Sequence, residues 1–396
     1  MKTNYLELNQ QNLEEMIKYL WFPNKIISFF ASTIIIKLLS KVTNEDKKII
    51  IEKIVSKITN LEIKEDKESA GNPLKHSLRI MKYALEDNFY EQNLFLLIFN
   101  WFFSQNFHPS ILFPIFSFFE TLIDQAYISK ENKNFLLGSF SSRFIELLPL
   151  NYEPSCQKLL QLLYSISKLK ILDHQQIQKL SNKIIENSSI LFGNEELKQF
   201  SISLFFRLSK LTLENINKEN INEKNYQHFF KMIEINQYLQ QFLNNPKLII
   251  DLVFSNDELL IQILDDFLFI YLKLKQNQDE KISNFRLNFS PIKMFEIFAQ
   301  EISFDHTILL DWILSAEMSE LVLVYLLHFL KFYSNYLKLK NLNENKKRKI
   351  DEDLSVEKEG IQKIFMKLYL SISSSYQKNL FPFNPTQLLK RISEII

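Results

Sequence analysis

Apolar residues recur at the spacing of an α-helix along almost the whole chain. Residues 43–58 carry such a stripe, and Thr43 is placed to cap the segment with Asp46 at the third helical position. Residues 321–333 are apolar nearly all round, interrupted chiefly by His328 and Lys331, which predicts an inner helix covered on most sides. Near the C-terminus the pattern of one buried helix face is complete, at Ile361, Ile364, Phe365, Leu368, Ile372 and Tyr376.

Proline marks the starts of several expected helices. A capping oxygen accepts an orphan backbone N–H, and proline at the first helical position has no N–H to lose. Four dipeptides have this form: Asn72-Pro73, Asn245-Pro246, Ser290-Pro291 and Asn384-Pro385. Ser255 to Glu258 resembles a capping box that opens a further helix.

These starts predict an all-α protein of helices about 10–20 residues long, joined by short connections. Helix pairs recur roughly every 40 residues, which is typical of HEAT or armadillo architecture. We therefore expect an irregular α-solenoid with a short helical C-terminal cap. Three parts are predicted: a helical-repeat domain at 1–340, a charged linker at 341–359 and a C-terminal helical module at 360–396.

Composition supports the helical prediction and excludes some chemistry. The 396 residues include 4 Gly and 10 Pro, too few for the many tight turns of an all-β fold. Phosphate-binding loops need several glycines close together. Gly71, Gly138, Gly193 and Gly360 are far apart in sequence, so we expect neither a dinucleotide-binding loop nor a P-loop.

Charge and hydropathy indicate a soluble intracellular protein. The net charge is +1, from 47 Lys+Arg and 46 Asp+Glu, so no global field favours nucleic acid or an anionic membrane. The apolar runs at 94–103 and 111–119 are shorter than the ~20 residues of a membrane-spanning helix. The N-terminus lacks the apolar region of a signal peptide, and the single Cys156 cannot form an internal disulfide.

Metal or nucleophilic chemistry is not expected from the residues that could support it. The six histidines are scattered, and none has a His, Cys or acidic partner at the spacing of a known site. Cys156 follows a predicted helix start, where its thiol pKa could fall, but a small buried side chain is the interpretation we favour. The sequence predicts no metal, no cofactor and no enzymatic activity.

Two segments are candidate interaction surfaces. The Phe-rich residues 93–119 could form a groove for a partner helix or a lipid, or two core helices, and we favour the core because aromatic residues dominate cores. The charged linker predicted at 341–359 contains a basic run, Lys346, Lys347, Arg348 and Lys349. This run has the composition of a nuclear-import signal that importin binds. Its alternative is a solvated charge run, partly neutralised by the acidic residues 351–353.

An acidic pair with a leucine run at 257–272 and two spaced signatures, at 304–325 and 380–385, resemble the Lines family. The resemblance covers roughly the last 140 residues. It begins in 257–272, with an acidic pair and a leucine run, and is most specific in 304–325, where Met318 replaces the family's usual Thr. The residues that carry the two signatures are Asp305, His306, Asp311, Trp312, Glu317, Tyr325, Phe381, Pro382, Phe383, Asn384 and Pro385.

Much of this signature has a structural interpretation. Asp305 suits an N-cap, while Ile308, Leu309, Trp312 and Ile313 share one face. Ser315 is placed to cap the next helix. Asn384 is an N-cap candidate with Pro385 after it, and Phe383 can contact Leu388 as a hydrophobic staple. We favour this interpretation over direct contact with a partner, although His306 and Asp311 are polar without a helix-end role.

The resemblance implies a non-enzymatic interaction scaffold. Lines proteins are implicated in developmental transcription control, in animals often linked to Wnt-type signalling, so we expect unidentified protein partners and a location in nucleus and cytoplasm. The first alternative is a cytoplasmic helical-repeat adaptor in transport or tethering. The second is an enzyme whose site is assembled across helices, which predicts a deep pocket with convergent polar groups.

Overall fold

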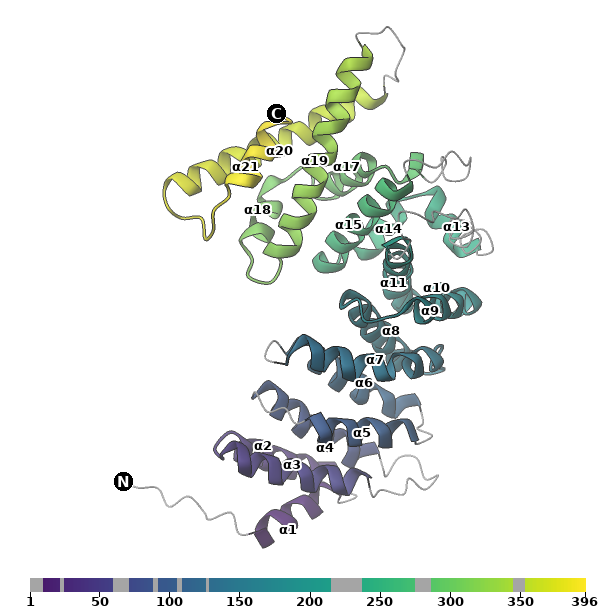
Figure 1. Cartoon of the computed structure of the whole chain (residues 1–396), viewed down its shortest axis with the longest axis vertical. Coiled ribbons are helices and arrows are strands. Elements are labelled where there is room, and N and C mark those ends of the chain that lie inside the picture. The colour runs from purple at the N-terminus through teal and green to yellow at the C-terminus, as the bar shows by residue number, and fades with distance from the viewer. Residues whose placement is uncertain are drawn as a thin grey trace. The chain divides into compact units, whose positions relative to one another are not determined.

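The computed structural model describes residues 10–21, 25–59, 71–87, 92–104, 109–125, 128–214, 237–274, 286–344 and 353–396. All regular secondary structure in these ranges is helical, which confirms the all-α prediction. The chain forms two compact units, Met1–Leu204 and Phe205–Ile396, which are described separately below. Figure 1 gives the order of the helices along the chain.

Unit 1 contains ten complete helices among its described residues, and an eleventh continues into unit 2. These helices are α1 (Gln10–Leu20), α2 (Lys25–Leu39), α3 (Asn44–Thr59), α4 (Gly71–Glu86), α5 (Gln92–Ser104), α6 (Pro109–Asp124), α7 (Lys130–Glu146), α8 (Glu153–Lys168), α9 (His174–Glu186), α10 (Ser188–Gly193) and α11 (Glu195–Glu214).

The described helices that lie wholly in unit 2 are fewer and include the two longest of the chain. They are α13 (Gln237–Asn244), α14 (Lys247–Val253), α15 (Asp257–Leu274), α17 (Pro291–Glu301), α18 (His306–Leu314), α19 (Ser319–Glu344), α20 (Asp353–Gln377) and α21 (Thr386–Ser393).

Helices of unit 1 pack in two parallel series. One series runs α2, α4, α6 and α8, each in contact with the next, and the other runs α3, α5, α7 and α9. Contacts of α3 with α4 and of α7 with α8 join the series, and Figure 1 shows the helices stacked pair after pair. The Phe-rich residues 93–119 supply core side chains such as Phe102, Phe116 and Phe119, as the sequence predicted.

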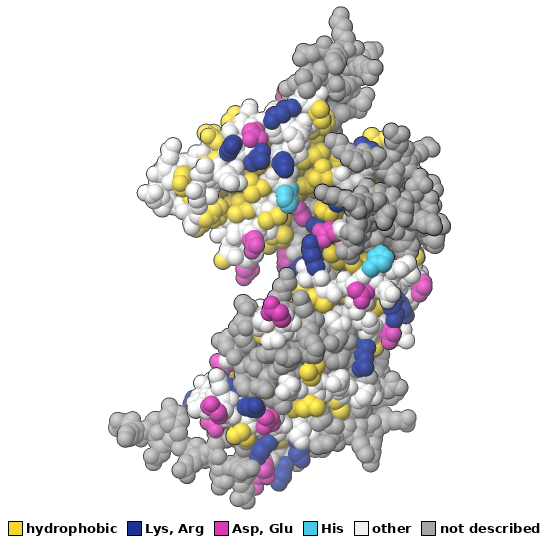
Figure 2. Space-filling model, viewed as in Figure 1, with side chains coloured by type: hydrophobic (Ala, Val, Ile, Leu, Met, Phe, Trp, Pro, Cys, Tyr) yellow, Lys and Arg dark blue, Asp and Glu magenta, His cyan; other side chains and the backbone are white. Residues whose placement is uncertain are grey.

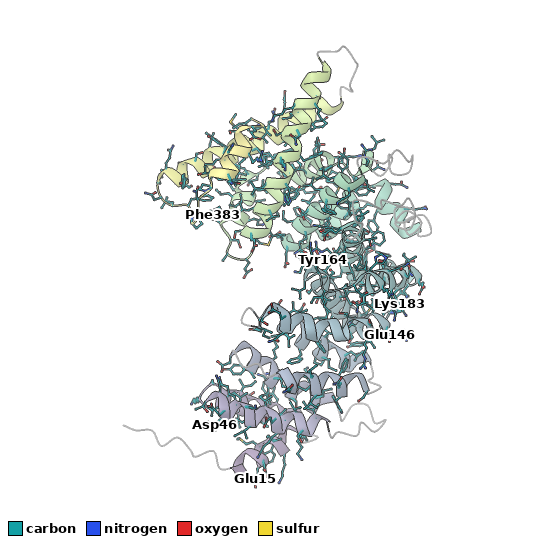
Figure 3. All side chains as sticks on the ribbon, in the orientation of Figure 1. Glu15, Asp46, Glu146, Tyr164, Lys183 and Phe383 are labelled. Carbon is teal, nitrogen blue, oxygen red and sulfur yellow. The ribbon has the colours of Figure 1, made fainter. Side chains whose placement is uncertain are left out.

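Side chains cap helix starts of unit 1, and the cap at Thr43 was predicted from the sequence. The Asp46 N–H donates to Thr43 Oγ1 at 3.3 Å at the start of α3, where Figure 3 shows Asp46. Asp173 and Gln176 form a reciprocal capping box at α9, with bonds of 2.8 and 3.1 Å. Each bond satisfies a backbone group that the helix itself leaves open.

Aromatic rings form much of the core of unit 2. Phe295 of α17 stacks on Phe329 of α19 with centroids 4.4 Å apart, and on Phe365 of α20 at 5.2 Å. The rings of Phe206 of α11 and Phe267 of α15 have centroids 4.4 Å apart. Such rings bury large apolar areas, so they hold helices that are distant in sequence against one another.

Helix starts in unit 2 confirm some predictions and correct others. Ser290 Oγ accepts from the Lys293 N–H at 3.2 Å, and Pro291 opens α17 as expected. The predicted capping box at Ser255 is wrong: Asn256 caps α15, since its Oδ1 accepts from the Leu259 N–H at 3.0 Å, and Leu259 has no polar side chain to bond back. Asn245 is not a cap, since α14 begins at Lys247 with no capping side-chain bond.

The predicted linker at 341–359 is shorter than the sequence indicated. Residues 341–344 belong to α19 and residues 353–359 to α20, and α20 packs on α17, α18 and α21. The boundary between the two compact units falls after Leu204, a position that the sequence did not mark. Lys346, Lys347, Arg348 and Lys349 lie outside the described residues. None of the described helices is long and apolar enough to cross a membrane.

Candidate functional site

A pocket of about 680 Å³ opens in unit 2 between α11, α15 and α19. Its lining residues recur at helical spacing, so one face of each helix is turned to the pocket. They are Lys210 and Glu214 of α11, Asp265, Leu268, Phe269, Tyr271 and Leu272 of α15, and His328, Lys331, Phe332, Asn335, Tyr336 and Leu339 of α19.

Helices α15 and α19 run in the same direction along the pocket. At one end His328 Nδ1 lies 3.5 Å from Asp265 Oδ1, and further along the rings of Tyr271 and Phe332 have centroids 5.6 Å apart. The pocket therefore has a polar end near Asp265 and an apolar wall that continues towards Leu272. Figure 2 shows hydrophobic side chains gathered over α19, with Lys and Arg side chains beside them.

A network of buried charges forms the polar end. Lys210 Nζ lies 2.6 Å from Asp265 Oδ2 and 3.0 Å from Asp266 Oδ1. Arg207 Nη1 lies 3.0 Å from the same Asp266 oxygen. The Asp266 side chain is only 1% exposed. A buried charge is tolerated when it is paired with an opposite one. Here the two cations of α11 pair with the two carboxylates of α15, and these pairs join the two helices.

Burial and neighbouring charges have opposite effects on the pKa values of Lys210 and Asp266, because burial favours the neutral form of each group and the opposite charges favour the charged form. Burial disfavours the charged Lys210 ammonium, but attraction to Asp266 and Asp265 outweighs it and raises the Lys210 pKa. Burial raises the pKa of the Asp266 carboxyl, while the Lys210 and Arg207 cations oppose that rise. Tyr325 lies nearby: burial raises its pKa well above the ordinary value, and the charge of Asp265 adds to the rise.

Cations lie over the aromatic walls of the pocket. Lys210 and Lys273 approach the Phe269 ring to 5.4 and 5.5 Å from its centroid. Arg286 lies 5.7 Å from the centre of the Tyr271 ring. Such contacts add attraction between a cation and the face of a ring. The rim next to the apolar wall is therefore basic.

The arrangement is suited to binding a ligand with a large apolar part. Ligand pockets measure about 300–1,000 Å³ and are lined mostly by apolar and aromatic side chains with a few polar groups. The cationic and anionic groups at the polar end bond to one another. Among the residues that the structure describes, no three His, Cys, Asp or Glu side chains gather to hold a metal ion.

The residues of the first Lines-like signature that lie in or next to α18 are outside the pocket, and several of them join helices of unit 2. Asp305 is an N-cap, as predicted, and accepts from the Thr307 N–H at 2.9 Å. The Thr307 hydroxyl also donates to Asp305 Oδ1, at 2.8 Å. The two bonds from Thr307 lower the pKa of the Asp305 carboxyl. Trp312 Nε1 donates to Asp257 Oδ2 at 3.0 Å, which joins α18 to α15. His306 Nε2 lies 3.1 Å from Ser371 Oγ of α20, which gives this polar residue a structural contact.

The other residues of the first signature divide between core and surface. Tyr325 is 2% exposed and belongs to the core beside the polar end of the pocket. Asp311 and Glu317 are exposed, and Ser315 Oγ accepts from the Glu317 N–H at 3.3 Å just before α19. Asp311 is thus the exposed polar residue of this group without a helix-end role.

The C-terminal signature forms the turn that leads into α21. Asn384 Oδ1 accepts from the Thr386 N–H at 3.0 Å, but α21 begins at Thr386, so Pro385 precedes the first turn. The ring of Phe381 contacts that of Phe383 edge to face, with centroids 4.9 Å apart, and Phe383 is labelled in Figure 3. Pro382 is exposed and Pro385 is buried. None of these residues lines the pocket.

The sequence analysis did not single out the pocket residues. Arg207 and Lys210 interrupt an otherwise apolar part of α11, and Asp265 and Asp266 interrupt the apolar α15. Adjacent acids within one apolar helix, and two bases within another, could have indicated a buried pairing. The pairing itself depends on residues more than 50 positions apart, which helical periodicity does not reveal.

Unit 1 offers a second exposed surface. On α2 the exposed residues Ile26, Phe29, Phe30 and Ile34 recur at helical spacing, with exposed fractions of 45–65%. Arg79 of α4 lies 4.7 Å from the centre of the Phe29 ring. Cys156 of the same unit is fully buried, and burial raises its thiol pKa, in keeping with a structural role.

Comparisons with known proteins add little to this geometry. No family model matches the chain, and no curated protein matches it. Among solved structures, the crystal structure of an engineered protein aligns with 97% of this chain and 98% of its own, at 11% identity and a TM-score of 0.32. That likeness is too weak to support an argument about fold or function. The resemblance to the Lines family therefore stays a prediction.

Proposed function

We propose that this protein is a non-enzymatic scaffold that binds a protein partner through the α11–α15–α19 pocket. The observation that carries the proposal is the aromatic pocket itself, about 680 Å³ in volume, with its charged groups neutralised at one end. Apolar walls with a few polar groups suit the anchor residues of a partner.

The proposed architecture behind this scaffold is a HEAT- or armadillo-like solenoid. Its support is the regular packing of α2, α4, α6 and α8 beside α3, α5, α7 and α9 in unit 1. In solenoids each repeat contacts its neighbours and leaves long surfaces for partners. The Lines resemblance adds a transcriptional role, partly in the nucleus, with the basic run Lys346–Lys349 as import signal.

The proposal is tested by cross-linking mass spectrometry on the tagged full chain in its own cells. Lys331 lines the pocket, Lys273 lies over the ring of the pocket residue Phe269, and both are exposed, so both are accessible to lysine cross-linkers. We expect one partner to be linked to these lysines in the wild-type chain and to be lost when Leu272 and Leu339 are both replaced by Arg. Equal cross-linking of the double variant would place the partner elsewhere and overturn the proposal.

The nuclear part has its own test. A reporter fused to the full chain should enter nuclei and should remain outside when Lys346, Lys347, Arg348 and Lys349 are all replaced by Ala. Ala substitution of the exposed Lys338, Lys363, Lys367 and Lys378, which leaves this run intact, serves as the control. Unchanged distribution of the Ala variant would remove the import role and leave the pocket proposal untouched.

A further inference from the structure

The charges around the pocket specify what kind of partner it takes. This inference rests on the proposed function, that the pocket binds a protein, and it concerns the chemistry of the segment that binds. Lys210 and Arg207 are paired with Asp265 and Asp266, so these two positive and two negative charges sum to zero at the polar end of the pocket. The charges that remain lie on the rim.

The rim is dominated by cations. Lys331 lines the pocket and is exposed, Lys273 is exposed over the Phe269 ring, and Arg286 lies over Tyr271. Within the described parts of the chain, no carboxylate forms an ion pair with Lys273 or Lys331. Among the residues that the structure describes, Glu214 is the one carboxylate besides Asp265 that lines the pocket. A basic rim of this kind attracts an acidic partner and repels a basic one.

The apolar wall has the length and form of a helix-binding groove. The pocket follows α19 from His328 to Leu339, about 16 Å or three helical turns. Leu272 and Leu339 are 45% and 53% exposed, so their apolar surface is available at the rim. A helix that packs beside two parallel helices places apolar residues i, i+3 or i+4, and i+7 into the space between them.

We propose that the pocket binds an acidic amphipathic helix of a protein partner. Its apolar face lies against Phe269, Phe332 and Tyr336, and acidic residues beside that face meet Lys273, Arg286 and Lys331. The two parts of the proposal are separable, because apolar contact gives affinity and the rim charges select the sign of the partner's charge.

The test is a selection from a displayed peptide library. Each peptide has apolar residues fixed at helical spacing over about three turns, and all other positions are random. The bait is the full chain, with counter-selection against the Leu272→Ser, Leu339→Ser double variant. We expect the enriched peptides to carry Asp and Glu beside the apolar face, and to become helical on binding as measured by circular dichroism.

Charge reversal then tests the rim. Lys331→Glu should weaken a selected peptide about tenfold in fluorescence anisotropy and should strengthen a copy of it with Lys in place of its acids. Lys338→Glu is the matched control, because Lys338 is exposed on the same helix and does not line the pocket. The loss at Lys331 should shrink at high salt.

Each outcome decides one part of the proposal. Enriched peptides without acidic excess, or equal affinities for Lys331→Glu and Lys338→Glu, would overturn the acidic preference while the pocket remains a peptide site. Peptides that bind without becoming helical would overturn the helix. If no peptide depends on Leu272 and Leu339, the proposed function fails together with this inference.

Discussion

Gly360 of α20 lies directly against the ring of Phe304, so that a Cβ at position 360 would come within 2.7 Å of Phe304 Cε1. Phe304 follows Ser303 at the end of α17, and both have positive φ, 54° and 55°. The Phe304 N–H donates to the Ala299 carbonyl at 2.7 Å, which closes the end of that helix. A glycine within a helix, unfavourable by itself, is explained by this close approach.

Replacing Gly360 by Ala should therefore destabilise the chain despite the better helix propensity of Ala. Overpacking costs about 1–3 kcal/mol, more than the roughly 1 kcal/mol that Ala gains over Gly in a helix. In a Phe304→Ala background the ring is absent, and the same change should be stabilising. Urea unfolding of the four chains measures the coupling, and equal effects in both backgrounds would show that the contact is unimportant.

Asp266→Asn should be among the most destabilising single changes in unit 2. It removes the buried carboxylate that pairs with both Lys210 and Arg207, and breaking a buried pair costs about 3–5 kcal/mol. Glu146→Gln is the matched control, because Glu146 pairs with Lys179 at 2.7 Å on the surface and is 62% exposed. That change should cost at most about 1 kcal/mol. Similar losses for both in urea unfolding would contradict a buried network.

Trp312→Phe should lose one interhelical hydrogen bond and keep the aromatic packing. The Trp312 ring stacks on Phe298 with centroids 5.8 Å apart, and its Nε1 donates to Asp257. The lost bond to a charged acceptor predicts about 1.5–3 kcal/mol of destabilisation. Asp257→Asn keeps an acceptor and should cost less. A full-sized loss in Asp257→Asn would show that charge at the start of α15 matters more than the bond.

Acidification should weaken unit 1 through His76. Burial, with Lys75 and Arg79 nearby, lowers the pKa of His76 below its ordinary value of 6.5, and its ring contacts Phe29. The unfolded chain therefore binds a proton at higher pH than the folded chain. Stability is kept above about pH 6.5 and falls as pH drops from there to the folded-state pKa.

Replacing His76 by Phe should reduce this loss on going from about pH 7.5 to about pH 5.5. In a Trp312→Phe background the remaining tryptophans, Trp21 and Trp101, both lie in unit 1, so their fluorescence follows that unit. His174→Phe, which changes an exposed histidine of the same unit, is the control. An unchanged pH dependence in His76→Phe would assign the effect to other groups.

The two faces of unit 1 should respond differently to truncation of phenylalanine. Phe116 of α6 is fully buried, and Phe116→Ala should cost about 3–5 kcal/mol. Phe30 of α2 is 59% exposed, and Phe30→Ala should change stability by less than about 0.5 kcal/mol. Urea unfolding compares them, and a large loss for Phe30→Ala would mean that this face of α2 is covered in solution.

Local features of the fold were predictable because they depend on neighbours in sequence. The caps at Thr43, Ser290 and Asp305 need partners two or three residues away, and each is present. Periodicity likewise identified buried residues of α20 from Ile361 to Ile372, but Tyr376, predicted on the same face, is 40% exposed. The exact ends of helices were not predictable in this way: Asn256 rather than Ser255 caps α15, and the predicted linker is partly helical.

The candidate site was not predictable in the same way. The sequence analysis gave most weight to the residues of the Lines-like signatures, and the structure gives several of these, such as His306 and Trp312, roles in joining helices. The pocket instead combines Lys210, Asp265 and Phe332 from three helices. These side chains form a pocket only because residues more than 50 positions apart in sequence come into contact.

The sequence by itself determined that this protein is helical, where many of its helices begin, and which stripes enter the core. Helical spacing, caps and scarce glycine act over a few residues, so they can be recognised along the chain. Tertiary structure alone decided that Lys210 meets Asp265 and Asp266, that Phe304 requires Gly360, and that α11, α15 and α19 leave a pocket. These relationships arise because packed helices bring distant residues into contact, and periodicity does not specify which helices pack together.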